Sequence, residues 1–482
     1  MDAQVVQPPY ISPTEGKTTP VAGQQSTMPP APNATPPKQS KFPKKLLIIL
    51  GLLLFLGVVG FGIYQFVVPL IVGPKETTIT WWGLWEDENI IAPLIAEYES
   101  SHPGVKIKYE KQSNQDYRER LTSALAAGDG PDIFRFHNSW VPMFASDLDR
   151  APETVFSVAD FAQTFYPVAA TDLTVGAGIV GVPLEYDALT LFINTEIFTA
   201  AGKSPPKTWD ELKDLARELT IVDERGVITQ SGVALGVTEN VDHWPEILAL
   251  MMLQNRVNLI RPTGELAERA LEYFVDFSKG DGVWDATLPS STDAFAAGKL
   301  AMYFGSHWRI FEIQQKNPNL KFRTVSLPQV PKDSPTEPNV SYATYWVEGV
   351  WAKSKNKTAA WDFLKFMSQK ETLEKFYQNA AAVRGMGEPY PRVEMASLLI
   401  DHPILGSIVA LAPEAQSWYL ASRTFDGPTG INSQIEAYFR DAVNAVNEGR
   451  SAKTALETAA AGVAQVLTQY GVISSQGSST SR

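Results

Sequence analysis

The sequence predicts an α/β protein with two lobes, preceded by a single membrane-spanning helix. Three observations lead to this prediction. Segments with the pattern of strands alternate with segments with the pattern of helices over about 400 residues. This length exceeds the size at which one hydrophobic core usually stops growing, so we expect two lobes. A run of 19 uncharged, mostly aliphatic residues, from Leu46 to Tyr64, precedes them.

The apolar run predicts a membrane anchor. As a helix it would be roughly 28 Å long, close to the thickness of the hydrocarbon core of a bilayer. Lys38, Lys41, Lys44 and Lys45 all precede it, so the positive-inside rule places the N-terminus in the cytoplasm and the large domain outside. A cleaved secretory signal is the alternative, but the head is too long and no Ala-x-Ala site follows. We therefore expect a single-pass protein of the cell membrane, with an anchor over residues 45–72.

Composition sets further limits. Residues 1–44 are rich in Pro, Gln, Thr and Ser, so we expect this head to be disordered, and we expect the same of the tail, 473–482. Residues 1–45 contain five lysines and two acidic residues, a formal charge of +3. Because the whole chain carries −12, the rest of the chain carries about −15. Such acidity argues against nucleic acid as a partner. The chain has no cysteine, so it contains neither a disulfide nor a lipid-modified cysteine.

The folded part begins with a βαβαβ pattern. The expected elements are strands at 79–83, 105–109 and 132–136 and helices at 90–101 and 117–127. This order predicts a parallel sheet, and such sheets bind ligands beyond the carboxyl ends of their strands. The loops Leu84–Asn89 and His137–Trp140 are therefore the first places to look for a site.

Strands and helices continue to alternate after this sheet. Thr208 followed by Glu211 forms the pattern of a capping box at a helix start. The other expected elements are strands at 190–193 and 300–304 and helices at 292–298, 359–368, 373–381, 431–447 and 451–470.

Five blocks between Thr77 and Tyr470 resemble a known family. They are Trp81-Trp82-Gly83-Leu84-Trp85 with Tyr98 and His102-Pro103-Gly104-Val105; Gly128–Ile133; Gly181–Leu212; Phe295–Met302 with Trp308; and Ala352–Leu364. In this order they resemble the extracellular solute-binding proteins of ATP-driven import systems, the broad family that includes the maltose-binding protein. The resemblance implies two α/β lobes joined by crossing strands, a ligand cleft between them, and binding rather than catalysis. Many relatives are free in a periplasm or held by a lipidated cysteine, which this chain lacks.

The resemblance also implies boundaries and partners. The expected boundaries are a solute-binding domain over 77–472, with lobe 1 at about 77–184 and 347–392, lobe 2 at about 188–343 and 395–472, and crossings near Pro183–Ala188 and Thr344–Val347. The expected partners are a small carbohydrate and the permease subunits of an ABC transporter.

A sugar needs aromatic rings to stack on its C–H faces and carboxylates, amides or Arg to bind its hydroxyls. Trp85 follows the first strand, Glu185 lies at a crossing, and Trp308 matches a family position that stacks on sugar. For Glu185 the alternative is a salt bridge at the hinge. The residues expected at the ligand are Trp85, Glu86, His137, Asn138, Glu185, Tyr186, Asp187, Trp244, Trp308, Tyr345, Trp346 and Arg384.

Enzyme signatures are weak. A glycosidase needs two carboxylates about 5–9.5 Å apart. Glu86, Asp87 and Glu88 are consecutive in a loop and rarely converge in that way, so a glycosidase is the weakest alternative. The five histidines form no His-Glu-x-x-His pair, and we expect no metal and no cofactor. Two alternatives stay open: the same fold binding a polyamine, a peptide or an anion, and a ligand sensor.

Overall fold

The computed structural model describes residues 44–63, 65, 76–334 and 336–474, in two compact units that divide after Val72. The predicted head (1–44) lies almost wholly outside the described residues, as does the tail from residue 475. Each unit is described by itself below.

The first unit contains one described helix, α1 (Lys44–Gly62). Within the described part of the chain, no helix is long and apolar enough to cross a membrane. Two of the 19 residues of α1 are the lysines at its start, which leaves 17, or roughly 26 Å at 1.5 Å per residue, against about 30 Å of hydrocarbon. The prediction of a membrane-spanning helix is therefore not supported, and Tyr64, at the end of the predicted run, lies outside the described residues.

The second unit starts with the predicted parallel sheet. Its strands are β1 (Thr77–Gly83), β2 (Val105–Lys111), β3 (Ile133–His137) and β12 (Trp346–Val350), in the order β12-β3-β1-β2. β1 is parallel to β2 and β3, and β12 is antiparallel to β3. Because successive side chains of a strand point to opposite faces, Trp81 is fully buried while its neighbour Trp82 is half-exposed.

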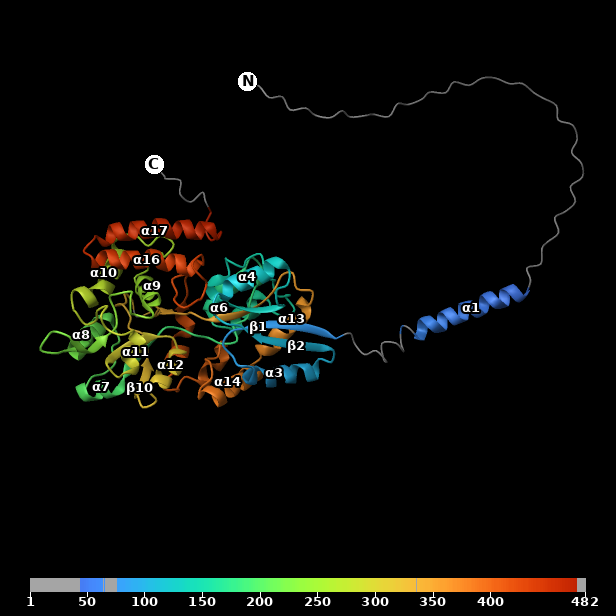
Figure 1. Ribbon diagram of the computed structural model, residues 1–482, viewed down its shortest axis with the longest axis horizontal. Helices are drawn as coiled ribbons and strands as arrows, with labels where there is room; N and C mark the ends of the chain where they lie inside the picture. Colours follow the sequence, from blue (N-terminus) through green and yellow to red (C-terminus); the bar gives the residue numbers. More distant parts are fainter. Residues whose placement is uncertain (1–43, 64, 66–75, 335, 475–482) are drawn as a thin grey trace, which may run out of the picture. The chain divides into compact units, whose positions relative to one another are not determined.

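Helices cover both faces of this sheet (Figure 1). α3 (Glu88–Ser101) connects β1 to β2 and packs with α13 (Lys357–Met367) and α14 (Lys370–Arg384), while α4 (Tyr117–Ala127) lies on the opposite side of the strands. The chain between β3 and the first crossing adds short elements: η2 (Asn138–Trp140), α5 (Val158–Thr164), α6 (Pro167–Leu173), β4 (Thr174–Val175) and β5 (Gly178–Ile179).

The second sheet is mixed and has five strands. They are β6 (Thr190–Asn194), β7 (Ile221–Val222), β8 (Ile228–Val233), β9 (Leu300–Gly305) and β10 (Phe322–Val325), in the order β10-β6-β9-β8-β7. Only β8 and β9 are parallel; the other neighbours pair antiparallel. Because all residues of β6 and β9 are buried, these two strands are the centre of this lobe.

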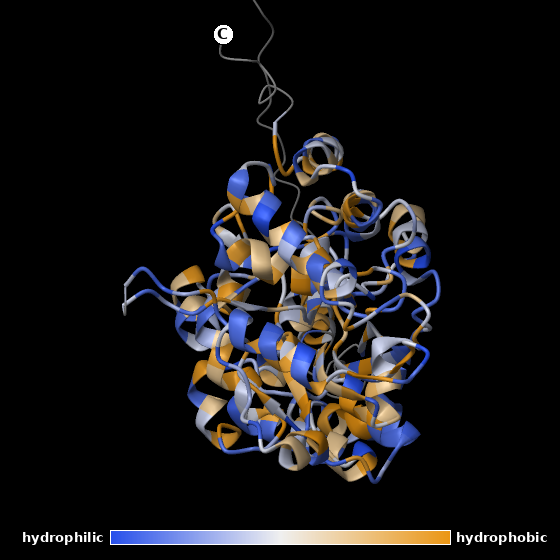
Figure 2. Cartoon of the chain, turned by 90° about the vertical axis from the view of Figure 1, so that its left-hand side faces the viewer, coloured by the Kyte–Doolittle hydropathy of each residue, from blue (hydrophilic) through white to orange (hydrophobic). Residues whose placement is uncertain are grey.

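Among the described residues, nine further helices and several short elements complete the unit. They are α7 (Thr195–Ala201), α8 (Trp209–Leu219), α9 (Trp244–Gln254), α10 (Glu265–Lys279), α11 (Ser291–Ala296), α12 (Arg309–Lys316), α15 (Gly406–Leu411), α16 (Ile431–Asn447) and α17 (Ala452–Gln469), with β11 (Ser341–Tyr342), η3 (Val393–Leu398), η4 (Ala412–Glu414) and β13 (Ala415–Gln416). α8 begins with the predicted capping box of Thr208 and Glu211. The surface helices carry hydrophilic and hydrophobic residues on different faces, as amphipathic helices do (Figure 2).

Two segments run side by side between the sheets. Val182 and Glu348 exchange both backbone hydrogen bonds, at 2.8 and 3.0 Å, and Thr344 N donates to Asp187 O at 3.0 Å. The pairing is antiparallel, and it continues to Leu189 N, which donates to Tyr342 O at 2.8 Å. A third segment joins them, because β13 pairs with β11. These paired segments connect the two lobes and bring residues of both to one cleft.

Candidate ligand-binding cleft

A cavity of about 450 Å³ lies between the two lobes. Residues that follow the carboxyl ends of β1 and β3 line it from one side, and residues from α9, α12 and the turn after β9 line it from the other. Its aromatic lining comes from both lobes: Trp85, Trp308, Phe311, Tyr345, Trp346 and Phe425. All of these side chains except Tyr345 are half-buried, so their rings are available to a ligand.

The first wall consists of aromatic rings packed edge to face. The ring centroids of Trp85 and Trp346 are 5.4 Å apart at 72°, and Phe425 lies 5.8 Å from Trp85. His137, the last residue of β3, contacts Trp346 edge-on at 5.2 Å. Burial lowers the pKa of His137 to about 3, so its ring is neutral at physiological pH. This wall is therefore held mainly by apolar contacts.

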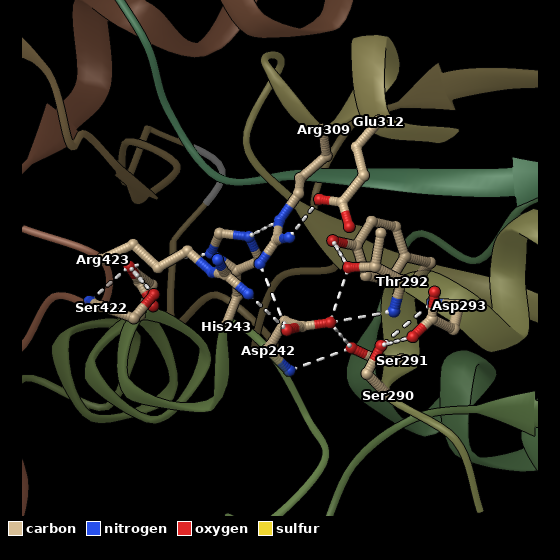
Figure 3. A network of polar contacts seen from close by, with 12 residues as sticks. Asp242, His243, Ser290, Ser291, Thr292, Asp293, Arg309, Glu312, Ser422 and Arg423 are labelled. Carbon is tan, nitrogen blue, oxygen red and sulfur yellow. Dashed lines mark hydrogen bonds and ion pairs between the residues drawn. The ribbon is translucent and has the colours of Figure 1, made fainter. Parts of the chain in front are cut away.

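The second wall is Trp308, which lies next to charged groups. Figure 3 shows three of them, Asp242, Arg309 and Arg423. The guanidinium carbon of Arg309 lies 4.3 Å from the Trp308 ring centroid, and that of Arg423 lies 5.9 Å away. Both arginines reach Asp242, at 3.3 and 3.1 Å. Burial alone would raise the pKa of Asp242, but the positive charge of Arg309 holds it well below its usual range. Cation–π contacts of this kind stabilise the ring in one orientation.

His243 and Glu246 extend this network towards the cavity. Arg309 Nε donates to His243 Nε2 at 2.9 Å, so the Nδ1 atom of that ring carries the proton and faces Glu246 at 3.7 Å. Ser422 donates to Glu246 Oε1 from its backbone nitrogen and its hydroxyl, at 2.8 and 2.9 Å. The other oxygen of Glu246 and the hydroxyl of Ser306 are buried without a partner in the described part of the chain. Both residues line the cavity, so both atoms are free to bind a ligand hydroxyl.

His307 joins three parts of the chain at the base of the cleft. Its Nδ1 lies 3.0 Å from Asp187 of the first crossing, and its Nε2 contacts Glu388, which also pairs with Arg384 at 2.8 Å. Burial alone would lower the pKa of His307, but the two carboxylates raise it well above its usual value. The imidazolium in turn lowers the pKa of Glu388 to about 2, although burial acts in the opposite direction. His307 is therefore charged, and it links the second lobe to Asp187 and to Glu388.

A buried cluster lies behind the first wall. Arg135 of β3 binds Glu86 at 2.7 Å and Glu348 at 2.6 Å and approaches Glu185 at 3.5 Å. Burial raises the pKa of Glu185 well above its usual value, despite the opposing effect of Arg135. Glu185 lines the cavity and, among the described residues, has only this one long contact with a cation, so it is available to a ligand, as Glu246 is.

Most residues predicted at the ligand do line this cavity. They are Trp85, His137, Glu185, Asp187, Trp308, Tyr345, Trp346 and Arg384. Trp85 and His137 follow the carboxyl ends of parallel strands, as expected. Asp187 lines the cavity and also forms the hinge salt bridge with His307 that was the alternative for this crossing.

Four predicted residues lie elsewhere. Glu86 is fully buried on Arg135, and Asn138 is buried with its side chain donating to Asp172 at 2.9 Å. The side chain of Tyr186 lies on the other side of the crossing segment, and its ring centroid is 4.9 Å from that of Tyr166. Trp244, the first residue of α9, is buried in the second lobe. Loop position alone could not exclude the first three, because Glu86, Asn138 and Tyr186 contact partners at least 20 positions away in the sequence.

Sequence reasoning missed several lining residues. They are Asn114, His243, Glu246, Ser306, His307, Phe311, Glu312, Gln315, Thr344, Glu388, Ser422, Arg423 and Phe425. Ser306 and His307 directly precede the predicted Trp308, and Phe311 follows one helical turn later, so these three could have been found. The segment from Ser422 to Phe425 carried no signal. Within the described residues, no cluster of three or more His, Asp or Glu side chains is arranged to hold a metal ion.

The fold and this cleft define a two-lobed binding protein. Residues 84–374, more than half of the chain, match the family described as bacterial extracellular solute-binding protein, and the chain belongs to this family. The family consists of binding proteins.

Individual relatives are distant. A maltotriose-binding protein of Pyrococcus abyssi is 23% identical over 296 residues, which cover 60% of this chain and 62% of that protein. A binding protein of Brucella abortus (strain 2308) is 23% identical over 325 residues, or 66% and 77% of the two chains. Among solved structures, the sugar-binding protein MalE of Xanthomonas citri has a TM-score of 0.65 at 20% identity, covering 82% of this chain and 98% of that one. A solute-binding protein of Thermotoga lettingae, bound to α-D-tagatose, has a TM-score of 0.62 at 22% identity. The match covers 81% of this chain and 100% of that one. These structures share the two-lobed α/β periplasmic-binding-protein fold.

Proposed function

We propose that this protein captures a carbohydrate in the cleft between its lobes and delivers it to the permease of an ABC transporter, with the solute-binding domain outside the cytoplasmic membrane. The observation that carries the proposal is the pair of aromatic walls. Half-buried rings from both lobes face one cavity, and free polar atoms of Glu185, Glu246 and Ser306 lie beside them. Stacking surfaces next to hydrogen-bonding groups suit the two kinds of surface that a sugar presents.

The names of several relatives support a sugar ligand. Similar proteins include the maltotriose-binding protein of Pyrococcus abyssi and structures bound to mannotriose and to maltotetraose. Their identities of 16–23% leave the particular sugar open. The proposed function does not depend on the predicted membrane anchor.

A polyamine is the strongest competing ligand, because five carboxylates line the cavity: Glu185, Asp187, Glu246, Glu312 and Glu388. Most of them already have partners. Asp187 and Glu388 bind His307, and Glu312 binds Arg309 and Lys316. A cage for an ammonium group needs several unpaired carboxylates, so the charge arrangement favours a neutral polyol.

A thermal-shift screen tests the proposal. A ligand that binds only the folded state raises stability by RT ln(1 + [L]/Kd), about 2.7 kcal/mol at a concentration 100 times Kd. The screen compares mono- and oligosaccharides with spermidine, a tripeptide and phosphate. We expect stabilisation by at least one sugar and none by the other three. Stabilisation by spermidine, peptide or phosphate alone would contradict the proposal.

A further inference from the structure

One segment beside the cavity has an unusual backbone. Among the described residues, four other than glycine have a left-handed conformation: Asp116, Arg256, Arg423 and Phe425, with φ between 51 and 60°. Side chains with a Cβ atom rarely adopt this region. Arg423 and Phe425 are two residues apart, and both line the cavity. We call residues Ser422–Phe425 the strap.

Contacts at both ends hold the strap in this conformation. At its start, Ser422 makes two hydrogen bonds to the buried Glu246 of α9. Directly after its end, the buried Asp426 accepts a hydrogen bond of 2.7 Å from Asn432 N in the first turn of α16. Thr424, in the middle, is 3% exposed. Unfavourable backbone conformations persist only where the surroundings fix them, and they cluster at functional sites such as ligand clamps.

The strap contacts one tryptophan of each wall. Arg423 reaches Asp242 beside Arg309 (Figure 3), and its guanidinium carbon lies 5.9 Å from the ring centroid of Trp308. Phe425 lies 5.8 Å from the ring centroid of Trp85. One short, rigid segment therefore connects the stacking surface of one lobe to that of the other.

We propose that the strap is a positioning element of the cleft, which fixes Trp85 and Trp308 relative to one another so that a bound sugar can stack on both. This inference rests on the proposed function, because it concerns the sugar ligand of the same cleft.

Glycine substitutions test the strap without disturbing its backbone. Glycine adopts the left-handed region readily, so Arg423→Gly and Phe425→Gly remove the side chains and keep the path of the chain. Arg256→Gly is the matched control, since Arg256 is also left-handed, pairs with Asp333 and Glu337, and lies outside the cavity. All three variants should unfold at temperatures close to that of the wild type.

The binding measurement uses maltotriose, mannotriose, glucose and mannose, with the full chain. In Arg423→Gly and Phe425→Gly, the affinity for each sugar that binds the wild type should fall roughly 2- to 30-fold, the range for loss of a cation–π or aromatic contact. In a Trp308→Ala background, Arg423→Gly should have no further effect, because the two residues act as a unit. Arg256→Gly should bind like the wild type. Unchanged sugar affinity in both strap variants would overturn the inference.

A measurement without ligand separates this inference from the proposed function. The measurement is an NMR spectrum, in which the indole N–H signals of Trp85 and Trp308 report the environment of each ring. The variants Trp85→Phe and Trp308→Phe assign these two signals. Arg423→Gly should shift the Trp308 signal and Phe425→Gly the Trp85 signal, and Arg256→Gly should shift neither. If the wild type binds none of the four sugars, the proposed function fails on its own. Unmoved indole signals would then show that the strap does not position the tryptophans either.

Discussion

The two walls of the cleft hold their tryptophans by different means. Trp85 and Trp346 lie at the ends of strands of the first sheet and contact each other and Phe425 through aromatic packing. Trp308 begins α12 and lies between the guanidinium groups of Arg309 and Arg423, which share Asp242. The first wall depends on apolar contacts, which vary little with pH or salt. The second depends on charged partners, of which Arg309 is fully buried and Arg423 is 46% exposed, and it is the more sensitive to a change in any one partner.

The largest effect should come from the one charge cluster behind the first wall. Arg135→Met leaves Glu86, Glu185 and Glu348 buried without their cation, and we expect a loss of about 3–5 kcal/mol in the free energy of unfolding. The loss should be larger at pH 8 than at pH 5, because the unpaired carboxylates can take up protons at the lower pH. Urea unfolding measures it, with Arg225→Met as control, since that arginine is 82% exposed. A loss no larger than that of the control would show that the cluster adds little to stability.

Removal of the second wall should have the next largest effect, on binding rather than folding. Trp308→Ala should weaken sugar binding by roughly 2–4 kcal/mol, the range for a central aromatic contact. Trp82 is also half-exposed but lies outside the cavity, so Trp82→Ala should leave the affinity unchanged. Calorimetric titration measures both. Equal affinities of the two variants would remove Trp308 from the site.

A smaller and pH-dependent effect should follow from the charged base of the cleft. His307→Gln loses the charge that binds Asp187 and Glu388, and we expect a loss of roughly 1.5–3 kcal/mol in the free energy of unfolding. The raised pKa of His307 contributes stability below the unfolded pKa of about 6.5, and this is lost as pH rises through the folded pKa. The lowered pKa of Glu388 contributes stability above about pH 4.5, and this is lost as pH falls towards about 2.

The difference between wild type and His307→Gln should therefore be largest between about pH 4.5 and 6.5, and it should decrease on either side. Urea unfolding at pH 3, 5.5 and 9 measures this dependence. A difference that does not change with pH would mean that the imidazole is not the charged partner of these carboxylates.

The smallest effect should come from Glu185, beside the first wall. Glu185→Gln keeps the shape and one acceptor oxygen, so sugar affinity should fall by about 1 kcal/mol. Burial raises the pKa of Glu185, so wild-type stability should decrease as pH rises from about 4.5 towards that raised value. The Gln variant should lack this decrease. Sugar recovered after long incubation should be intact with both proteins; cleavage by the wild type that disappears in the variant would indicate a glycosidase.

The sequence predicted the first wall better than the second for a physical reason. The strands, α4 and α16 follow from local periodicity, and Trp85 and His137 follow from the rule that ligands bind beyond the carboxyl ends of parallel strands. The partners of Trp308 depend on contacts between distant segments: Arg423 pairs with Asp242 across 181 positions. Glu86 lies outside the cavity lining for the same reason, because it binds Arg135, which lies in the middle of β3. Trp308 itself was found through a family resemblance and not through its local pattern.

The apolar run is a different case. Its composition predicted a helix long enough to span a bilayer, and this prediction is not supported within the described residues, where the helix runs from Lys44 to Gly62. Composition indicates where an apolar helix forms but does not fix its ends, which depend on the residues at its termini.

Calorimetric titration of the wild-type protein with maltotriose, mannotriose, spermidine, a tripeptide and phosphate tests the central claim most directly. The account predicts that at least one trisaccharide binds with one molecule per chain and a negative change in heat capacity, as expected when sugar faces are buried against Trp85 and Trp308. It also predicts that this binding is weaker by roughly 2–4 kcal/mol in Trp308→Ala. Saturable binding of spermidine, peptide or phosphate without binding of any sugar would contradict the account.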